Sequence, residues 1–202
     1  MAMQMADFAE EWLKTKMAVQ FSGPFGEQQR SIILAFCGAM LDNKIVSHRY
    51  HGGAGATSLA IGLSLWAAAT GGAKCVGIIC RSTKAARTIR ICISDAWEKL
   101  TGYSQPPPIA VRELGNIKGM YAERVFGPQN ARRIEVIRPS LVVVDACASE
   151  IEKRSEMAAN RLVSHVNAAK SVGDCQSPAG VLVLWGGDGS RNLAADIYER
   201  NI

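Results

Sequence analysis

The sequence predicts a three-layer α/β/α sandwich built on a mostly parallel, Rossmann-like sheet. Short apolar runs of strand length alternate with longer segments of helical period. Several of these runs are continuously apolar, which is typical of parallel strands that helices cover on both faces. A glycine-rich turn separates the first strand from its helix, as in many ligand-binding α/β proteins. We expect one domain over residues 1–202, with helices of residues 1–42 packing on the sheet.

The order of the expected elements follows from these patterns. Two helices, over 7–19 and 27–41, are separated by a Gly-Pro break. A strand over 44–50 leads through the glycine turn into a helix over 57–69, which two glycines end. The remaining expected elements are strands over 75–80, 109–111, 134–137, 141–145 and 181–185, and helices over 82–100, 120–125, 150–172 and 191–200.

The loops that follow the strands are expected to form a pocket, because the carboxyl ends of parallel strands meet at one edge of the sheet. Backbone N–H groups of a glycine loop, together with the N-terminus of the next helix, bind anions. We therefore expect a nucleotide-like or other anionic small molecule there. The predicted binding residues are Gly52, Gly53, Gly55, Thr57, Arg81 and Asp145. Further residues at the strand ends are Ser82, Glu113, Asn116, Cys147, Gly187 and Asp188.

Composition limits the possible classes of partner. The net charge is +5, and Lys84, Arg87 and Arg90 on one expected helix form a candidate nucleic-acid surface. The six cysteines show neither a disulfide framework nor zinc-ligand spacing. We expect no metal site and an intracellular, reducing compartment, cytoplasmic or nuclear. No signal peptide is expected, and the apolar run over 54–69 is too short to span a bilayer.

One interpretation of the pocket is a degenerate P-loop. Gly55-Ala56-Thr57 stands where a P-loop has Gly-Lys-Thr, and the strand before Asp145 corresponds to the strand that carries the magnesium-binding carboxylate. Ala56 replaces the lysine that contacts the β- and γ-phosphates.

This part of the chain resembles the ATPase domain of viral DNA-packaging terminases. The resemblance lies in residues 138–145. It implies an adenine-contacting glutamine at Gln28 or Gln29, and an acid after the aspartate, where this chain has Ala146. A disabled, ATPase-derived domain is therefore one expectation.

A second interpretation is a dinucleotide-binding domain. Gly53 and Gly55 match the first two glycines of that fingerprint, while Ser58 occupies the third position. Arg81 ends the second expected strand, where it suits the 2′-phosphate of NADP better than a bare ribose.

A third resemblance covers most of the chain. Residues 43–46, 56–59, 70–78, 141–145 and 180–184 are similar to a plant family of methyltransferase-like proteins. This resemblance implies a methyltransferase-type sheet, although Arg81 stands where S-adenosylmethionine-binding relatives usually carry an acid.

The leading expectation is thus a methyltransferase-like protein that binds its ligand at the Gly52–Gly55 loop with weak or absent catalysis. The ATPase-derived domain and a non-catalytic partner-binding module are the two alternatives. Candidate cofactors are S-adenosylmethionine, NADP and ATP. No catalytic residue is predicted, since His48 and His51 beside the turn have no carboxylate partner that the sequence identifies.

Overall fold

The computed structural model describes residues 1–51, 53–102, 106–114, 122–126, 133–147, 155–169, 179–187 and 192–201. For residues 122–126, 133–137 and 187 it describes the backbone alone.

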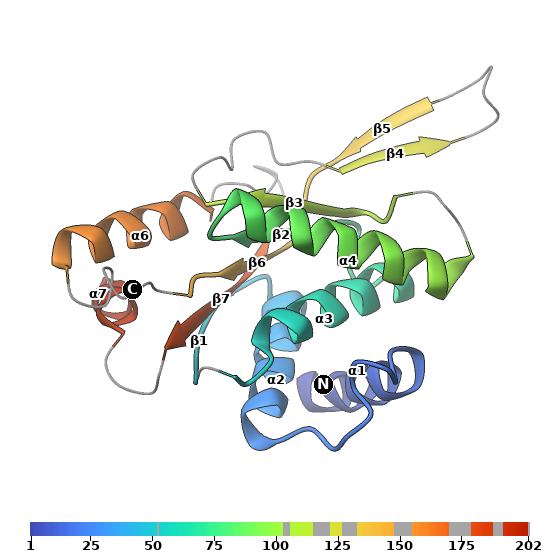
Figure 1. Cartoon of the computed structure of the whole chain (residues 1–202), viewed down its shortest axis with the longest axis horizontal. Coiled ribbons are helices and arrows are strands. Elements are labelled where there is room, and N and C mark those ends of the chain that lie inside the picture. The colour runs from blue at the N-terminus through green and yellow to red at the C-terminus, as the bar shows by residue number, and fades with distance from the viewer. Residues whose placement is uncertain are drawn as a thin grey trace.

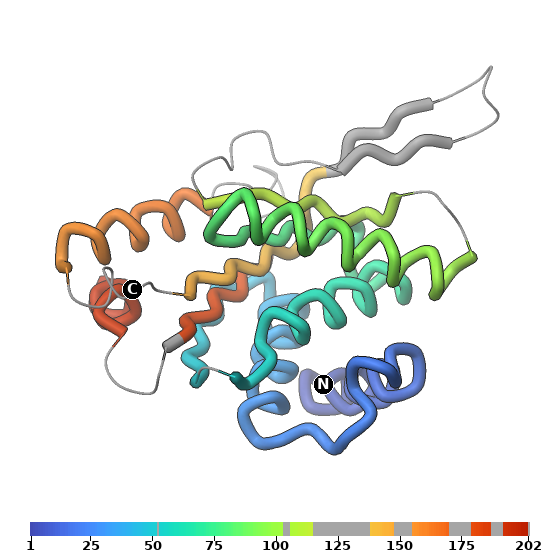
Figure 2. Tube along the Cα trace, viewed as in Figure 1, coloured from blue at the N-terminus to red at the C-terminus, as the bar shows by residue number. Residues whose placement is uncertain are grey.

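The main sheet of the described chain contains five parallel strands in the order β1-β7-β6-β2-β3. The last strand, β7, returns beside β1, so segments from opposite ends of the chain lie next to each other (Figures 1 and 2). The expected parallel sheet is therefore confirmed. The strands are β1 (Ile45–His51), β2 (Val76–Cys80), β3 (Ile109–Glu113), β6 (Leu141–Asp145) and β7 (Gly180–Gly187).

Helices cover both faces of this sheet. One face carries α2 (Glu27–Asp42), α3 (Ala56–Thr70) and α4 (Thr83–Thr101), and the other carries α6 (Glu156–Ala169) and α7 (Leu193–Arg200). The first helix, α1 (Ala2–Lys16), packs on α2 and α3 (Figure 1). This arrangement confirms the three-layer α/β/α architecture. No helix among the described residues is both long and apolar enough to cross a membrane.

Alternation along the strands fills two separate cores. In β6, Leu141 and Val143 pack on the α2–α4 side, whereas Val142 and Val144 pack on the α6–α7 side. All four side chains are completely buried. Residues that point to opposite faces must both be apolar when helices cover both faces, and this explains the continuous apolar run.

The helix α2 lies close against the start of β7. A Cβ atom on Gly180 would collide with the backbone carbonyl of Ala39 in α2. Glycine at this position therefore allows the helix backbone to contact the sheet directly. Near its end, α2 thus lies directly on the sheet, where it contacts β1 and β7. At its start, Gln28 accepts a hydrogen bond from His51 N at the end of β1.

A small second sheet pairs β4 (Ala122–Phe126) antiparallel with β5 (Arg133–Ile137). The expected strand over 134–137 is confirmed, but the helix expected over 120–125 is wrong. A segment this short fits the helical and the strand period equally well. The segment forms a strand because it pairs with β5. The sequence of residues 120–125 alone does not show that this pairing occurs.

The strand order separates the glycine-loop strand from the strand that follows it in sequence. In the usual dinucleotide-binding order, 3-2-1-4-5-6, the first and second strands are neighbours. Here β7 and β6 lie between β1 and β2. The end of β2, and with it Arg81, therefore adjoins the aspartate strand β6 and not the glycine loop.

Candidate functional site

The glycine loop has a backbone that favours glycine at two described positions. Gly53 and Gly55 have φ angles of +85° and +71°, in the left-handed region that side chains with a Cβ rarely adopt. Gly55 directly precedes α3, and its carbonyl accepts the first helical hydrogen bond from Leu59 N at 2.9 Å. Nothing lies within 4 Å of a Cβ built on Gly53, so the loop faces open space there. Gly52 lies outside the described residues.

Thr57 and Asp145 come together at the start of α3. Thr57 Oγ1 donates a hydrogen bond of 2.7 Å to Asp145 Oδ2. The aspartate ends β6, and the residue is 9% exposed. Burial raises its pKa, which hydrogen bonds from Thr57, Tyr50 and the Cys147 backbone N–H counteract. The structure therefore holds a nearly buried carboxylate against the helix that follows the glycine loop.

Tyr50 is a member of this site that the sequence did not reveal. Its hydroxyl donates to Asp145 Oδ1 at 3.3 Å and also interacts with the thiol of Cys147. Burial and the aspartate charge raise the pKa of Tyr50, so its phenol stays protonated. A Cβ on Gly186 would lie 2.5 Å from Tyr50 Oη and 3.0 Å from Cys147 Sγ. Glycine at the end of β7 therefore makes room for both side chains.

The start of α2 contacts the glycine loop through two glutamines. Gln29 Nε2 donates to Ala54 O at 3.4 Å, and Gln29 Oε1 accepts from Gly26 N at 2.9 Å. Gln28 Oε1 accepts a hydrogen bond of 3.4 Å from His51 N. Both glutamines that the terminase resemblance singled out thus lie at the loop.

Arg81 follows β2 and contacts the segment after Asp145. Its Nη1 donates a hydrogen bond of 2.6 Å to the carbonyl of Cys147. The next residue, Ser82, accepts from Ala85 N at 3.2 Å and is the N-cap of α4. Glu113 accepts a short hydrogen bond from Thr83. Asn116 and Asp188 lie outside the described residues, as does the side chain at 187.

Two alanines occupy the positions that distinguish the chain from an active P-loop ATPase. Ala56 is the first residue of α3 and Ala146 follows Asp145, and both are buried. Neither side chain can contact a phosphate through a charge or act as a base. In the described part of the chain, no three His, Cys, Asp or Glu residues gather closely enough to hold a metal ion by themselves.

The histidines beside the loop differ in environment. His48 Nε2 is buried and has no hydrogen-bond partner among the described residues. Burial lowers the pKa of His48, so this imidazole is neutral at pH 7. His51 is exposed, and its backbone N–H contacts Gln28. This geometry assigns neither side chain an acid–base partner.

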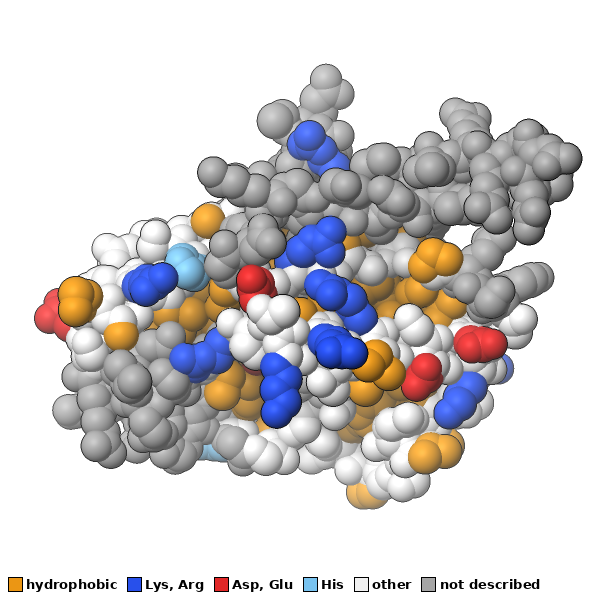
Figure 3. Space-filling view, turned by 45° about the horizontal axis from the view of Figure 1, so that its top comes forward, with side chains coloured by type: hydrophobic (Ala, Val, Ile, Leu, Met, Phe, Trp, Pro, Cys, Tyr) orange, Lys and Arg blue, Asp and Glu red, His pale blue; other side chains and the backbone are white. Residues whose placement is uncertain are grey.

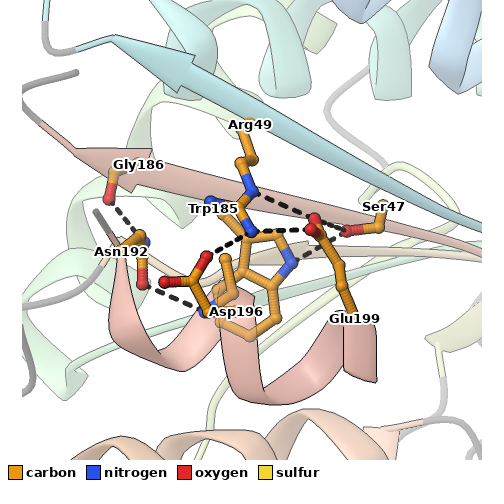
Figure 4. A network of polar contacts seen from close by, with 8 residues as sticks. Ser47, Arg49, Trp185, Gly186, Asn192, Asp196 and Glu199 are labelled. Carbon is orange, nitrogen blue, oxygen red and sulfur yellow. Dashed lines mark hydrogen bonds and ion pairs between the residues drawn. The ribbon is translucent and has the colours of Figure 1, made fainter. Parts of the chain in front are cut away.

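A polar network fixes α7 on the outer end of the sheet (Figure 4). Arg49 Nη2 on β1 lies 2.7 Å from Asp196 Oδ1 and 2.6 Å from Glu199 Oε2, both on α7. Trp185 Nε1 on β7 donates to Ser47 Oγ at 3.0 Å. Asn192 caps α7 and donates to Gly186 O at 3.0 Å, so the same network anchors the end of β7.

An apolar hollow lies far from the glycine loop. It is formed by Met5, Phe8 and Trp12 of α1 and by Trp66 near the opposite end of α3. Phe8 is 73% exposed, although it is a large apolar side chain. None of these residues belongs to the Thr57–Asp145 site.

Comparison with models of known protein families finds no match for this chain. A comparison with curated proteins finds none either.

Proposed function

We propose that this protein is a P-loop-type nucleotide-binding domain, derived from ATPases like those of DNA-packaging terminases, with weak or absent hydrolysis. The observation that carries this proposal is the 2.7 Å hydrogen bond between Thr57 Oγ1 and Asp145 Oδ2. In P-loop NTPases, a Ser or Thr after the glycine loop and an Asp at the end of another strand hold the same magnesium ion.

The strand order supports a P-loop domain over a dinucleotide-binding or methyltransferase-like one. One strand, β7, separates the glycine-loop strand from the aspartate strand, and many P-loop ATPases place one strand between the two. Dinucleotide-binding and methyltransferase-like domains use the end of the strand beside the glycine loop to contact a ribose or its phosphate. Here that neighbour is β7, not β2, so Arg81 does not occupy this position. The methyltransferase-like interpretation shares the parallel sheet and the glycine turn, and it stands second.

The two side chains suit magnesium. Mg²⁺ prefers oxygen ligands and binds proteins through one or two side chains, with phosphates and waters completing its shell. The Thr57 hydroxyl and the Asp145 carboxylate would hold the ion. Burial raises the pKa of Asp145, and none of the described groups that hydrogen-bond to its carboxylate carries a positive charge. When bound, the ion would neutralise phosphate charge.

Gln28 and Gln29 would contact the base of the nucleotide. Both already hydrogen-bond to the glycine loop, at His51 N and Ala54 O, so the start of α2 lies where a nucleotide on that loop would extend. A side-chain amide has both a donor and an acceptor, which matches the edge of adenine.

The two alanines are the reason for weak hydrolysis. A base near the attacking water contributes about 10²–10⁴-fold in rate, and Ala146 offers no such group. Ala56 also offers no charge to the transferring phosphate. We therefore propose that binding of a nucleotide, and the change in shape or partner that it controls, is the function of this site.

A second part of the proposal concerns nucleic acid. Lys84, Arg87 and Arg90 are exposed on α4, whose first turn contains no acid. Lys84 lies in this first turn, where the helix dipole disfavours a cation, and the phosphates of a nucleic acid would offset that cost. Figure 3 shows Lys and Arg side chains gathered on this face. We propose that they bind a nucleic-acid backbone.

A thermal-shift panel tests the choice of ligand. Mg-ATP, Mg-ADP, NADP and S-adenosylmethionine are each compared with buffer. A ligand at 100 times its Kd stabilises by about 2.7 kcal/mol, which corresponds to a Tm increase of about 5–10 °C for a chain of this size. We expect the increase with the magnesium nucleotides. An increase with NADP or S-adenosylmethionine alone would contradict the proposal.

A further inference from the structure

The glycine loop lacks the positive charge that a phosphate site needs. Residues 51–58 contain no lysine or arginine. Asp145 adds a negative charge beside Thr57, and a nucleoside di- or triphosphate would add several more. Magnesium offsets only part of that charge, so a site for such a ligand requires a cation from another segment.

Arg81 is connected to the Asp145 carboxylate through Cys147. The guanidinium donates to the Cys147 carbonyl at 2.6 Å. The backbone N–H of the same Cys147 hydrogen-bonds to the Asp145 carboxylate, and its thiol interacts with Tyr50. The parallel pairing of β2 with β6, with Ile79 opposite Val144, brings the ends of the two strands to the same level. One residue thus joins the arginine to the Thr57–Asp145 pair.

Three other described arginines contact groups outside the Thr57–Asp145 site. Arg90 Nη2 and Arg112 Nη1 each donate to Val111 O on β3, at 3.0 Å. Arg49 is paired with the acids of α7. Arg81, in contrast, lies at the carboxyl edge of the sheet and contacts Cys147, two residues after Asp145.

We infer that Arg81 supplies the phosphate-binding cation that the glycine loop lacks at Ala56. This inference rests on the proposed nucleotide function. A guanidinium has five N–H donors in a planar fork, and this fork binds phosphate oxygens in pairs. The Arg81 side chain is exposed, so its head can move from Cys147 O toward a phosphate. The preferred ligand is then a nucleoside di- or triphosphate, in which the phosphate tail contributes much of the affinity.

Isothermal titration of the full chain with Mg-ADP, Mg-ATP and adenosine tests this role. The variants are Arg81→Ala, Arg81→Lys and, as a matched control, Arg200→Ala in the last turn of α7. We expect Arg81→Ala to weaken Mg-ADP binding by about tenfold or more, as for loss of a charge-assisted hydrogen bond. Arg81→Lys should recover part of the affinity, while Arg200→Ala should match the wild type.

Adenosine separates a phosphate contact from a structural role. Its affinity should be the same in wild type and Arg81→Ala, and the circular dichroism spectra of the two should agree. An equal loss for adenosine and for Mg-ADP would overturn the inference, since it would indicate a damaged site. If wild type binds Mg-ADP and Arg81→Ala binds it equally well, this inference fails and the proposed function stands. If wild type binds no nucleotide, both fail.

Discussion

The hydroxyl of Thr57 is hydrogen-bonded to the carboxylate of Asp145, although the two residues are 88 positions apart in sequence. The contact joins the start of α3 to the end of β6 across the intervening strand β7. It gives the buried carboxylate one of the hydrogen bonds that offset its lost hydration. A carboxylate in this environment is costly unless hydrogen bonds and a cation compensate for lost hydration.

The first prediction concerns the pH dependence that Asp145 imposes. Burial raises its folded-state pKa, so the native state binds more protons than the unfolded state, and stability falls as pH rises from about 4 through the folded pKa. Asp145→Asn removes this loss of stability, because an amide does not ionise. Urea unfolding across this range should show the variant gaining stability relative to wild type with increasing pH. A constant difference between the two proteins would contradict the buried-charge account.

The second prediction concerns the space around Tyr50. In Gly186→Ala, the new methyl group would lie 2.5 Å from Tyr50 Oη. We expect a loss of about 1–3 kcal/mol in the free energy of unfolding, as for similarly overpacked sites. The matched control is Gly38→Ala inside α2, where a Cβ meets nothing within 4 Å. That change should stabilise the protein by about 0.5–1 kcal/mol. Equal effects of both changes would show that Gly186 is not sterically required.

The third prediction concerns the attachment of α7 to β1. Arg49→Ala removes contacts with Asp196 and Glu199, whose side chains are 29% and 40% exposed. Because exposed ion pairs contribute about 0.2–1 kcal/mol each, we expect a loss of about 0.5–1.5 kcal/mol at low salt. The measurement is urea unfolding with and without 1 M added NaCl, because guanidinium chloride is itself a salt. At 1 M the Debye length is about 3 Å, so the salt screens exposed ion pairs. A loss that persists unchanged in salt would assign the effect to packing.

The fourth prediction concerns the basic face of α4. Binding to a short DNA duplex should weaken with salt, and each of Lys84→Ala, Arg87→Ala and Arg90→Ala should reduce the slope of log K against log salt by about 1. Lys99→Ala, at the opposite end of the same helix, is the control and should leave the slope unchanged. Fluorescence anisotropy provides the measurement. Slopes that respond equally to Lys99→Ala would show diffuse attraction by net charge.

The sequence was most informative where local pattern decides the structure. Four consecutive apolar residues before Asp145 predict a buried strand, and the glycine turn predicts the start of α3, so both partners of the hydrogen bond were expected at one edge of the sheet. The order of the strands was not predictable, because periodicity does not show which strand pairs with which. The dinucleotide-binding and methyltransferase-like interpretations require the end of the second strand beside the glycine loop, whereas Arg81 adjoins β6.

Two further features of the structure differ from what the sequence predicts, for the same reason. Tyr50 ends an alternating strand, and nothing local indicates that its hydroxyl contacts an acid 95 residues away. The segment at 122–126 is a strand because β5 pairs with it, as the register of Arg124 with Glu135 shows. In both cases the deciding contact comes from a distant part of the chain. The glutamines at the start of α2 were identified through the terminase resemblance, not through any local pattern.

Binding of Mn²⁺ in place of Mg²⁺, followed by electron paramagnetic resonance in the presence of ADP, tests the magnesium-nucleotide site most directly. We predict that wild type binds the ion only when ADP is present. Thr57→Ala and Asp145→Asn should each weaken this binding by about tenfold or more, because each removes one ligand of the ion. Arg200→Ala should bind the ion as wild type does. Binding that is independent of ADP, or that Asp145→Asn leaves unchanged, would contradict the account.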